Sequence, residues 1–194
     1  MAPDSITILP IELQHLNVVA TLHYDTLPDD FLPALGLSFL KKAYYPAVVK
    51  SPYAKTFIAQ DDKQIAGCIT IATDGELFIK EVIANNMVKL CLYAMYKAIR
   101  SPKFLYLSFE IFWSSITGKP DPVKGEIIFI GVNREYQGKG IGKLLVNSAL
   151  DHLKQNSIKF CRTKTLEKNT NVINMYENMG WKVRDHFSLI TRKY

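Results

Sequence analysis

The stretch Gln137-Gly138-Lys139-Gly140-Ile141-Gly142 lies between an apolar run, Ile127 to Val132, and an amphipathic stretch, Ile141 to Leu153. This layout is typical of a buried strand that leads through a glycine-rich turn into a helix. Glycines accept backbone angles that side chains forbid, and the first N–H groups of a helix have no partners within the helix. Several backbone N–H groups therefore point to one place, where a phosphate or pyrophosphate group fits well.

The spacing of these glycines excludes two common nucleotide-binding motifs. A Walker A loop ends in Gly-Lys-Ser or Gly-Lys-Thr, but Leu144 follows Gly142 and Lys143. The dinucleotide fingerprint needs a third glycine at the position of Lys143. The pattern that remains is Gln-x-x-Gly-x-Gly, and a turn that only connects a strand to a helix is the alternative interpretation.

A second segment, residues 169 to 181, has the signals of a short helix. Asn169, Thr170 or Asn171 is suited to cap the start of the helix, and Gly180 to end it in a left-handed conformation. Val172 and Tyr176 lie on the same face of this helix. Taken alone, Tyr176 would be a core tyrosine whose hydroxyl bonds a neighbour, and Asn169 only a helix cap.

Together, the two segments resemble the GNAT superfamily of acetyl-CoA-dependent N-acetyltransferases. The glycine-rich turn is similar to the pyrophosphate loop of the family. The second segment is similar to a family pattern in which Asn is followed seven residues later by Tyr-Glu, and then by Gly and an aromatic residue. The resemblance covers roughly residues 126 to 184. It implies an α/β (α+β) GNAT-like fold with a central, mostly antiparallel sheet of six to seven strands and helices on both faces.

The resemblance also implies two catalytic residues. Tyr176 would protonate the departing thiolate, because the pKa of a free tyrosine lies only slightly above that of a thiol. Glu126 stands where many family members carry a glutamate that deprotonates the amine through water, although an exposed carboxylate at a strand end is the alternative. The residues expected to bind acetyl-CoA are Ile130, Gly131, Val132, Gln137, Gly138, Lys139, Gly140, Ile141, Gly142, Lys143, Asn169 and Tyr176.

The sequence leaves the general base open. At about 3.3 Å per residue, Glu126 lies roughly 13 Å along the strand from Ile130, so a water relay would be required. A family subset that acts on protein N-termini uses a glutamate five residues before the motif Asn, and Lys164 stands at that position here. His23 and His186 are further candidates, because histidine titrates in the useful pH range.

The activity implied by the resemblance is direct transfer of an acetyl group from acetyl-CoA to a primary amine of a small molecule. A faint similarity of residues 27 to 52 to a bacterial subgroup associated with surface-polysaccharide synthesis suggests an amino sugar as the acceptor. Tyr24, Asp25, Tyr44 and Tyr45 are candidates to line its pocket. The alternatives are a binding module for acetyl-CoA without catalysis, and a protein N-terminal or lysine acetyltransferase.

Length and charge indicate a single domain over residues 1–194 with a basic C-terminal part. The net charge is +6, and residues 134 to 194 carry 12 Lys and Arg against 5 Asp and Glu. This excess suits a polyanionic cofactor, although a solvated basic surface is the alternative. Without a recognisable nucleic-acid motif, we expect no nucleic-acid partner.

The cysteines and the apolar stretches indicate the compartment. Cys68, Cys91 and Cys161 lie far apart without metal-binding spacing, so we expect reduced thiols and no metal. The sequence shows neither a signal peptide nor an apolar stretch near the roughly 20 residues that a spanning helix needs. We expect a cytoplasmic protein without a membrane span, as a monomer or homodimer.

The hydrophobic patterning predicts an alternation of strands and helices, and Gly67 suggests a bulge or a close backbone approach. The predicted strands are 6–9, 56–60, 65–73, 126–132, 159–166, 181–184 and 187–191, and the predicted helices are 11–24, 33–49, 86–100, 104–113, 140–155 and 170–179.

Overall fold

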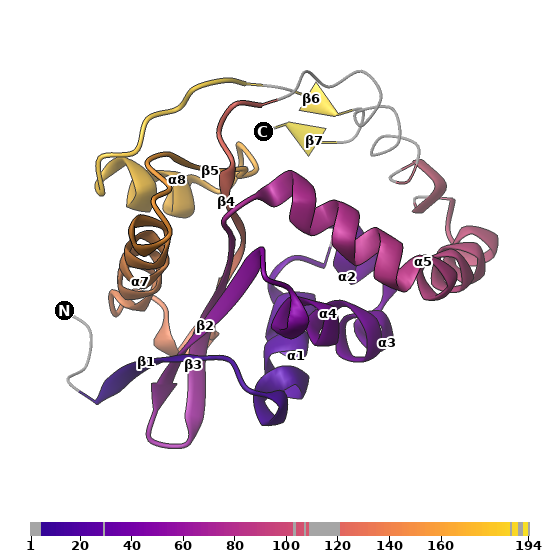
Figure 1. Cartoon of the computed structure of the whole chain (residues 1–194), viewed down its shortest axis with the longest axis horizontal. Coiled ribbons are helices and arrows are strands. Elements are labelled where there is room, and N and C mark those ends of the chain that lie inside the picture. The colour runs from indigo at the N-terminus through magenta and orange to yellow at the C-terminus, as the bar shows by residue number, and fades with distance from the viewer. Residues whose placement is uncertain are drawn as a thin grey trace.

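A five-stranded mixed sheet forms the centre of the molecule (Figure 1). The computed structural model describes residues 5–28, 30–102, 104–106, 108, 121–186, 188–189 and 192–193. The strands lie in the order β1-β2-β3-β4-β5, and all neighbours are antiparallel except the parallel pair β4 and β5. Their bounds are β1 Ile6–Pro10, β2 Ala54–Asp61, β3 Gln64–Ala72, β4 Gly125–Val132 and β5 Cys161–Thr163.

The expected mixed, mostly antiparallel sheet is confirmed, but the expected six to seven strands are not. Residues 181 to 186 have no regular structure, so the strand predicted at 181–184 is wrong. Strand β6, Ser188–Leu189, pairs with β7, Arg192–Lys193, in a separate two-stranded sheet. The predicted strand at 159–166 is only the three residues of β5, because no pairing with β4 continues after Thr163 in the described ranges.

Helices cover both faces of the sheet (Figure 1). Helices α1 to α5 lie on one face and α7 and α8 on the other, so the expected helix–sheet–helix layering is confirmed. Their bounds are α1 Leu16–Thr26, α2 Phe31–Leu35, α3 Leu37–Phe39, α4 Tyr45–Lys50, α5 Gly75–Arg100, α7 Ile141–Gln155 and α8 Thr170–Glu177, with single turns at Leu13–His15, Leu40–Tyr44 and Arg134–Tyr136.

Two helix predictions need correction. The helix expected over 33–49 is interrupted at Gly36, whose φ of 110° no α-helix contains, and it continues as short segments. Helix α5 starts at Gly75 rather than at residue 86, because the Asp74 side chain caps it by accepting a hydrogen bond of 3.0 Å from the Leu77 N–H. The region 104–113 lies partly outside the described residues, and 104–106 are helical.

The β2–β3 hairpin is confirmed, and Gly67 has both of the features expected of it. The register shifts by one residue between Ala59 and Gln60, beside Gly67. A Cβ atom at Gly67 would lie 2.9 Å from the carbonyl oxygen of Gly131 and 3.2 Å from the Leu145 side chain. Glycine therefore lets β3, β4 and α7 pack closely.

Two hydrophobic clusters stabilise the layers and place β4 between them. Phe129 belongs to the cluster on the side of α1, and Ile127 to the cluster on the side of α7. Both side chains are nearly fully buried. Strand β4 is therefore covered on both faces, as the apolar run predicts, and its C-terminal end leads directly into the glycine-rich turn.

No helix within the described ranges is long and apolar enough to cross a bilayer.

Candidate active site

The glycine-rich turn holds backbone N–H groups that have no acceptor within the described part of the chain. Gly138 and Gly140 have φ angles of 75° and 79°, in the left-handed region that favours glycine. Helix α7 starts with the Lys143 N–H, which donates to the Gly140 carbonyl at 3.1 Å. None of the hydrogen bonds among the described residues uses the N–H groups of residues 138 to 142. These groups lie at the positive end of a fifteen-residue helix, which favours an anionic ligand.

Two hydrogen bonds fix this turn to the end of the sheet. The Gln137 side-chain amide donates to the Val132 carbonyl at 3.0 Å. The Asn133 N–H donates to the Ala66 carbonyl at 2.8 Å and extends the contact between β3 and β4. The Gln137 amide therefore holds the turn in place, and its contact with the cofactor stays a prediction.

Helix α8 packs against the start of α7 through Gly142. A Cβ atom at Gly142 would lie 2.9 Å from the Met175 sulfur, so only glycine allows this approach without a shift. The turn is otherwise open, because a Cβ atom at Gly138 would meet nothing within 4 Å. Lys139 and Lys143 are exposed beside it, and the Lys139 ammonium lies 5.0 Å from the centre of the Tyr136 ring. Open space, positive charge and free N–H groups fit a phosphate-bearing ligand.

Strands β4 and β5 pair only at the first residues of β4. The last paired residues are Ile127 and Thr163, and the Thr163 hydroxyl donates to the Ile127 carbonyl at 3.4 Å. Beyond this point, Ile130, Gly131 and Val132 pair with β3 on one side and have no strand partner on the other within the described ranges. The free edge of β4 therefore runs from this point to the glycine-rich turn.

Tyr176, on α8, lies where β4 and β5 separate. Its side chain is 5% exposed and packs on Trp181 with the ring centres 4.8 Å apart. Thr163 lies near the Tyr176 hydroxyl, yet the hydroxyl has no hydrogen-bond partner among the described residues. Burial raises the pKa of Tyr176 to about 12. A buried hydroxyl without a partner is costly, and a bound ligand would satisfy it.

Asn169 precedes α8 but does not cap it with its side chain. The helix starts with the Val172 N–H donating to the Asn169 backbone carbonyl at 3.1 Å, and no side-chain cap hydrogen bond forms. The interpretation of the Asn169 side chain as a helix cap is therefore wrong, whereas its contact with the cofactor stays a prediction. Gly180 ends the segment with a φ of 85°, as expected.

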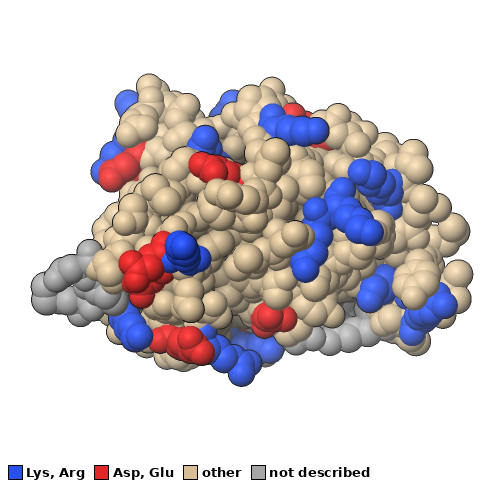
Figure 2. All heavy atoms as spheres, turned by 90° about the horizontal axis from the view of Figure 1, so that it is seen from below, with Lys and Arg blue, Asp and Glu red and all other residues tan. Residues whose placement is uncertain are grey.

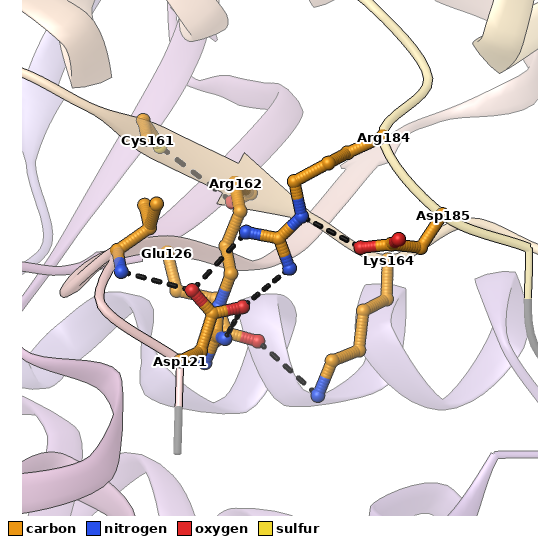
Figure 3. A network of polar contacts seen from close by, with 8 residues as sticks. Asp121, Glu126, Cys161, Arg162, Lys164, Arg184 and Asp185 are labelled. Carbon is orange, nitrogen blue, oxygen red and sulfur yellow. Dashed lines mark hydrogen bonds and ion pairs between the residues drawn. The ribbon is translucent and has the colours of Figure 1, made fainter. Parts of the chain in front are cut away.

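Glu126 lies in a network of ion pairs rather than at an exposed strand end (Figure 3). Its side chain is 8% exposed, and its Oε2 atom accepts from Arg162 Nη2 at 2.7 Å and from Nε at 3.1 Å. Lys164 Nζ lies 3.7 Å from the other oxygen. The interpretation of Glu126 as an exposed carboxylate is therefore wrong, and Lys164 pairs with the very carboxylate expected to act as base.

Asp121 extends this network toward the C-terminal part of the chain (Figure 3). It accepts from Arg162 at 2.5 Å and from Arg184 at 2.5 and 3.1 Å. Hydrogen bonds from Arg184 hold the pKa of Asp121 well below its usual range, although burial opposes them. Arg162 thus connects the start of β4 to the preceding loop, and Asp121 in this loop connects to Arg184 in the segment after α8.

The other candidate residues lie away from the turn. His23 is 2% exposed, stacks on Phe129 with the ring centres 3.9 Å apart, and lies 3.0 Å from the Tyr45 hydroxyl through Nδ1. Tyr44 and Tyr45 are 2% and 0% exposed, so their expected place in an acceptor pocket is wrong, because they fill the core. His186 is exposed.

Sequence reasoning missed Arg162, Thr163 and Met175. Thr163 and Arg162 become relevant only through the β4–β5 register, which pairs them with Ile127 and Glu126. A weak signal was present, because a carboxylate on a buried strand needs a cation on a neighbouring strand. Within the described residues, no group of His, Cys, Asp and Glu is arranged to hold a metal ion.

Comparisons with known proteins agree with this architecture. Residues 105–181 match the model of the Acetyltransferase (GNAT) family. The chain is 25% identical over 71 residues to a mycothiol acetyltransferase from Propionibacterium freudenreichii subsp. shermanii, and 29% identical over 69 residues to one from Nocardia farcinica. These segments are 37% and 36% of this chain, which spans about a quarter (23%) of each of these relatives.

A solved structure is similar over nearly the whole chain. An aminoglycoside N-acetyltransferase, AAC(6')-Iy, in complex with CoA has a TM-score of 0.64 at 12% identity, with 97% of both chains covered. This similarity shows the fold. Residues 105–181 are therefore similar to the Acetyltransferase (GNAT) family, and the chain has the fold of this neighbour.

Proposed function

We propose that the protein is an N-acetyltransferase that transfers the acetyl group of acetyl-CoA to a primary amine of a small molecule. One observation carries this proposal: unsatisfied hydrogen-bonding groups lie at both ends of one free strand edge. The N–H groups of residues 138 to 142 lack acceptors at one end. The buried Tyr176 hydroxyl lacks a partner at the other. Such groups need a ligand that spans the edge.

The residues present fit acetyl-CoA as this ligand. The N–H groups from Gly138 to Gly142 would hold the pyrophosphate, with Lys139 and Lys143 adding positive charge. The free edge of β4 over Ile130, Gly131 and Val132 offers backbone hydrogen bonds to an extended chain of amides. Asn169 offers a side-chain amide without a cap hydrogen bond. Acetyl-CoA supplies an activated acetyl thioester.

Tyr176 is the proposed acid that protonates the thiolate. With a pKa raised to about 12 by burial, its hydroxyl stays protonated at neutral pH and so can donate a proton or a hydrogen bond there. The shift makes proton transfer from Tyr176 to the thiolate less favourable than from a free tyrosine, so we propose that the hydroxyl first stabilises the developing thiolate by donating a hydrogen bond, along which the proton then passes. No hydrogen-bond partner for it lies among the residues that the structure describes, which keeps the hydroxyl available.

Glu126 remains our proposal for the group that receives the amine proton, acting through water. Its carboxylate is held by Arg162 at 2.7 Å and Lys164 at 3.7 Å, so it has little freedom to move toward a substrate. A water relay is compatible with a fixed carboxylate, whereas direct proton transfer is not. The same ion pairs favour a second candidate function, a binding module for acetyl-CoA without catalysis.

For the acceptor we propose an amine-bearing sugar. Support comes from the fold similarity to an aminoglycoside N-acetyltransferase. The end of α1 lies beside the proposed cofactor strand, because a Cβ atom at Gly131 would come within 3.1 Å of the Thr26 hydroxyl of α1. We therefore expect the end of α1 and the start of α2 to form part of the acceptor site.

Two measurements test the proposal in order. Calorimetry with acetyl-CoA tests the binding site, and the absence of binding at high micromolar concentration would reject it. Thiol release with a panel of amino sugars, amino acids and peptides tests the transfer, with desulfo-CoA as a non-transferring competitor. Binding with competition but without thiol release from any amine favours the binding module.

A further inference from the structure

Helix α5 presents an apolar surface to solvent in the half from Ala84 to Ile99. The exposed fractions are 73% for Val88, 57% for Leu92, 60% for Met95 and 79% for Ile99. These residues follow one another at spacings of three and four, so they form one continuous stripe along the helix. Soluble monomers rarely expose an apolar surface of this extent.

The charged residues of this half are turned back toward the protein. Lys89 Nζ lies 3.4 Å from the Lys42 carbonyl oxygen, to which it donates. The Lys97 side chain lies against Gly36, with Cε 3.6 Å from the position of a Cβ atom there. No other charged residue occurs between residues 84 and 99. Arg100 follows at the end of α5, where it is exposed and its guanidinium carbon lies 4.0 Å from the centre of the Tyr96 ring. The stripe is therefore uncharged along its centre, as is typical of a protein–protein interface, and carries a positive charge only at its C-terminal end.

The apolar residues of the stripe match those of a second copy of α5 that runs in the opposite direction. Apolar residues occur in pairs at equal distances from the point between Cys91 and Leu92. The pairs are Ala84 with Ile99, Met87 with Tyr96, and Val88 with Met95. All of these are exposed. Two copies of α5 packed antiparallel about this point would place each residue of a pair on its counterpart, as a two-fold interface requires.

We propose that α5 forms the interface of a two-fold symmetric homodimer, with the two helices antiparallel and centred between Cys91 and Leu92. The exposed parts of Met87, Val88, Leu92, Met95, Tyr96 and Ile99 amount to roughly 700 Å² per copy, which is close to the area of about 800 Å² that each partner contributes to a standard-size interface. The interface leaves the proposed acetyl-CoA site free, because the glycine-rich turn and α8 lie on the other face of the sheet (Figure 1).

The alternative partner for the apolar stripe of α5 is the surface of a lipid membrane. Lys and Arg side chains gather on the right side of Figure 2, which is the side where α3 and α5 lie in Figure 1. A helix that lies in an anionic membrane interface carries its lysines beside the apolar stripe and directs them to the lipid head groups. Lys89 and Lys97 instead contact the protein body, which favours a protein partner.

Sedimentation of the purified chain tests the dimer. We expect a dimer in the micromolar range, and substitution of Val88→Glu together with Met95→Glu to raise the dimer dissociation constant at least about 100-fold. Leu13→Glu is the matched control, because Leu13 is also an exposed leucine, at 70%, but lies in the turn before α1. This control should sediment like the unmodified chain, and circular dichroism should show that both variants are folded.

Crosslinking tests the register even if the double variant fails to fold. Cys91 is exposed at the centre of the stripe, whereas Cys68 is buried. A short bismaleimide should therefore link two unmodified chains through Cys91, and Cys91→Ser should abolish the link while leaving sedimentation unchanged. An unmodified chain that sediments as a monomer near about 100 μM would overturn the proposal, whether or not it binds anionic vesicles. A dimer that Cys91 cannot link would also contradict it.

Discussion

His23 should make the stability of the protein depend on pH in a predictable direction. Burial lowers the pKa of His23 to about 4, with the Asp30 carboxylate opposing, whereas the ordinary value is 6.5. Since the folded-state pKa is depressed, the unfolded chain binds the proton more tightly. The stabilisation by neutral His23 is therefore complete above about pH 6.5, is lost as the pH falls toward 4, and changes little below that.

The size of this effect follows from the difference between the two pKa values. Between about pH 7.5 and about pH 4.5, the His23 proton should remove about 2.5 kcal/mol from the free energy of unfolding, since one pKa unit corresponds to about 1.36 kcal/mol. The ring is 2% exposed, so solvent screening does not reduce the value greatly. Protonation would place a cation against Phe129 in the core.

Urea unfolding of the unmodified protein and of His23→Gln measures this difference. Glutamine keeps a polar group near the Tyr45 hydroxyl, which lies 3.0 Å from His23, but does not titrate. The variant should be less stable at neutral pH and should lack the additional loss of about 2.5 kcal/mol on acidification. The other histidines are common to both proteins and cancel in the comparison. Parallel pH profiles for the two proteins would refute the reasoning.

Three further substitutions test the proposed site. Tyr176→Phe should lower kcat about 10²- to 10³-fold and leave the acetyl-CoA dissociation constant nearly unchanged in calorimetry; an unaltered kcat would remove its role as acid. Gly140→Val should weaken acetyl-CoA binding at least about tenfold, whereas Gly180→Val, with a similar φ of 85° against 79°, should cause similar strain without changing affinity. Glu126→Gln and Arg162→Met should both lower the melting temperature, but only Glu126→Gln should lower kcat, by about 10²-fold. If the two variants have the same kcat, the role of Glu126 is purely structural.

The glycine-rich turn and the helix after Asn169 could be predicted from the sequence because their signals are local. Gly138, Gly140 and Gly180 occupy positive φ angles, and this requirement is visible in the residue type itself. The apolar run before the turn was likewise sufficient to predict a strand covered on both faces. These signals fixed the position of the candidate binding site without knowledge of the rest of the chain.

The surroundings of Glu126 could not be predicted because they depend on contacts between distant segments. Arg162 reaches Glu126 only through the parallel register of β4 and β5, and Arg184 reaches Asp121 from beyond α8. The raised pKa of Tyr176 likewise follows from burial, which the sequence does not specify. The number of strands was overestimated, because an apolar strand pattern at 181–184 does not determine whether a pairing edge is available.

Helix α5 illustrates a different limit of sequence reasoning. Its residues between Gly75 and Arg100 are apolar on several faces, so periodicity predicted only the second half of the helix. The same all-round apolar character leaves Val88 and Ile99 exposed after the helix has packed on the body of the protein. The apolar surface on α5 therefore became visible only in the structure, because the sequence does not show which face of the helix packs on the protein.

Amide hydrogen exchange with and without acetyl-CoA, resolved by residue, tests the central claim most directly. In the free protein, the N–H groups of residues 138 to 142 lack acceptors and should exchange rapidly. On saturation with acetyl-CoA, their exchange should slow at least about tenfold, as hydrogen bonds to the pyrophosphate form. Saturable binding that leaves these five amides unprotected would contradict the account, because the ligand would then be held elsewhere.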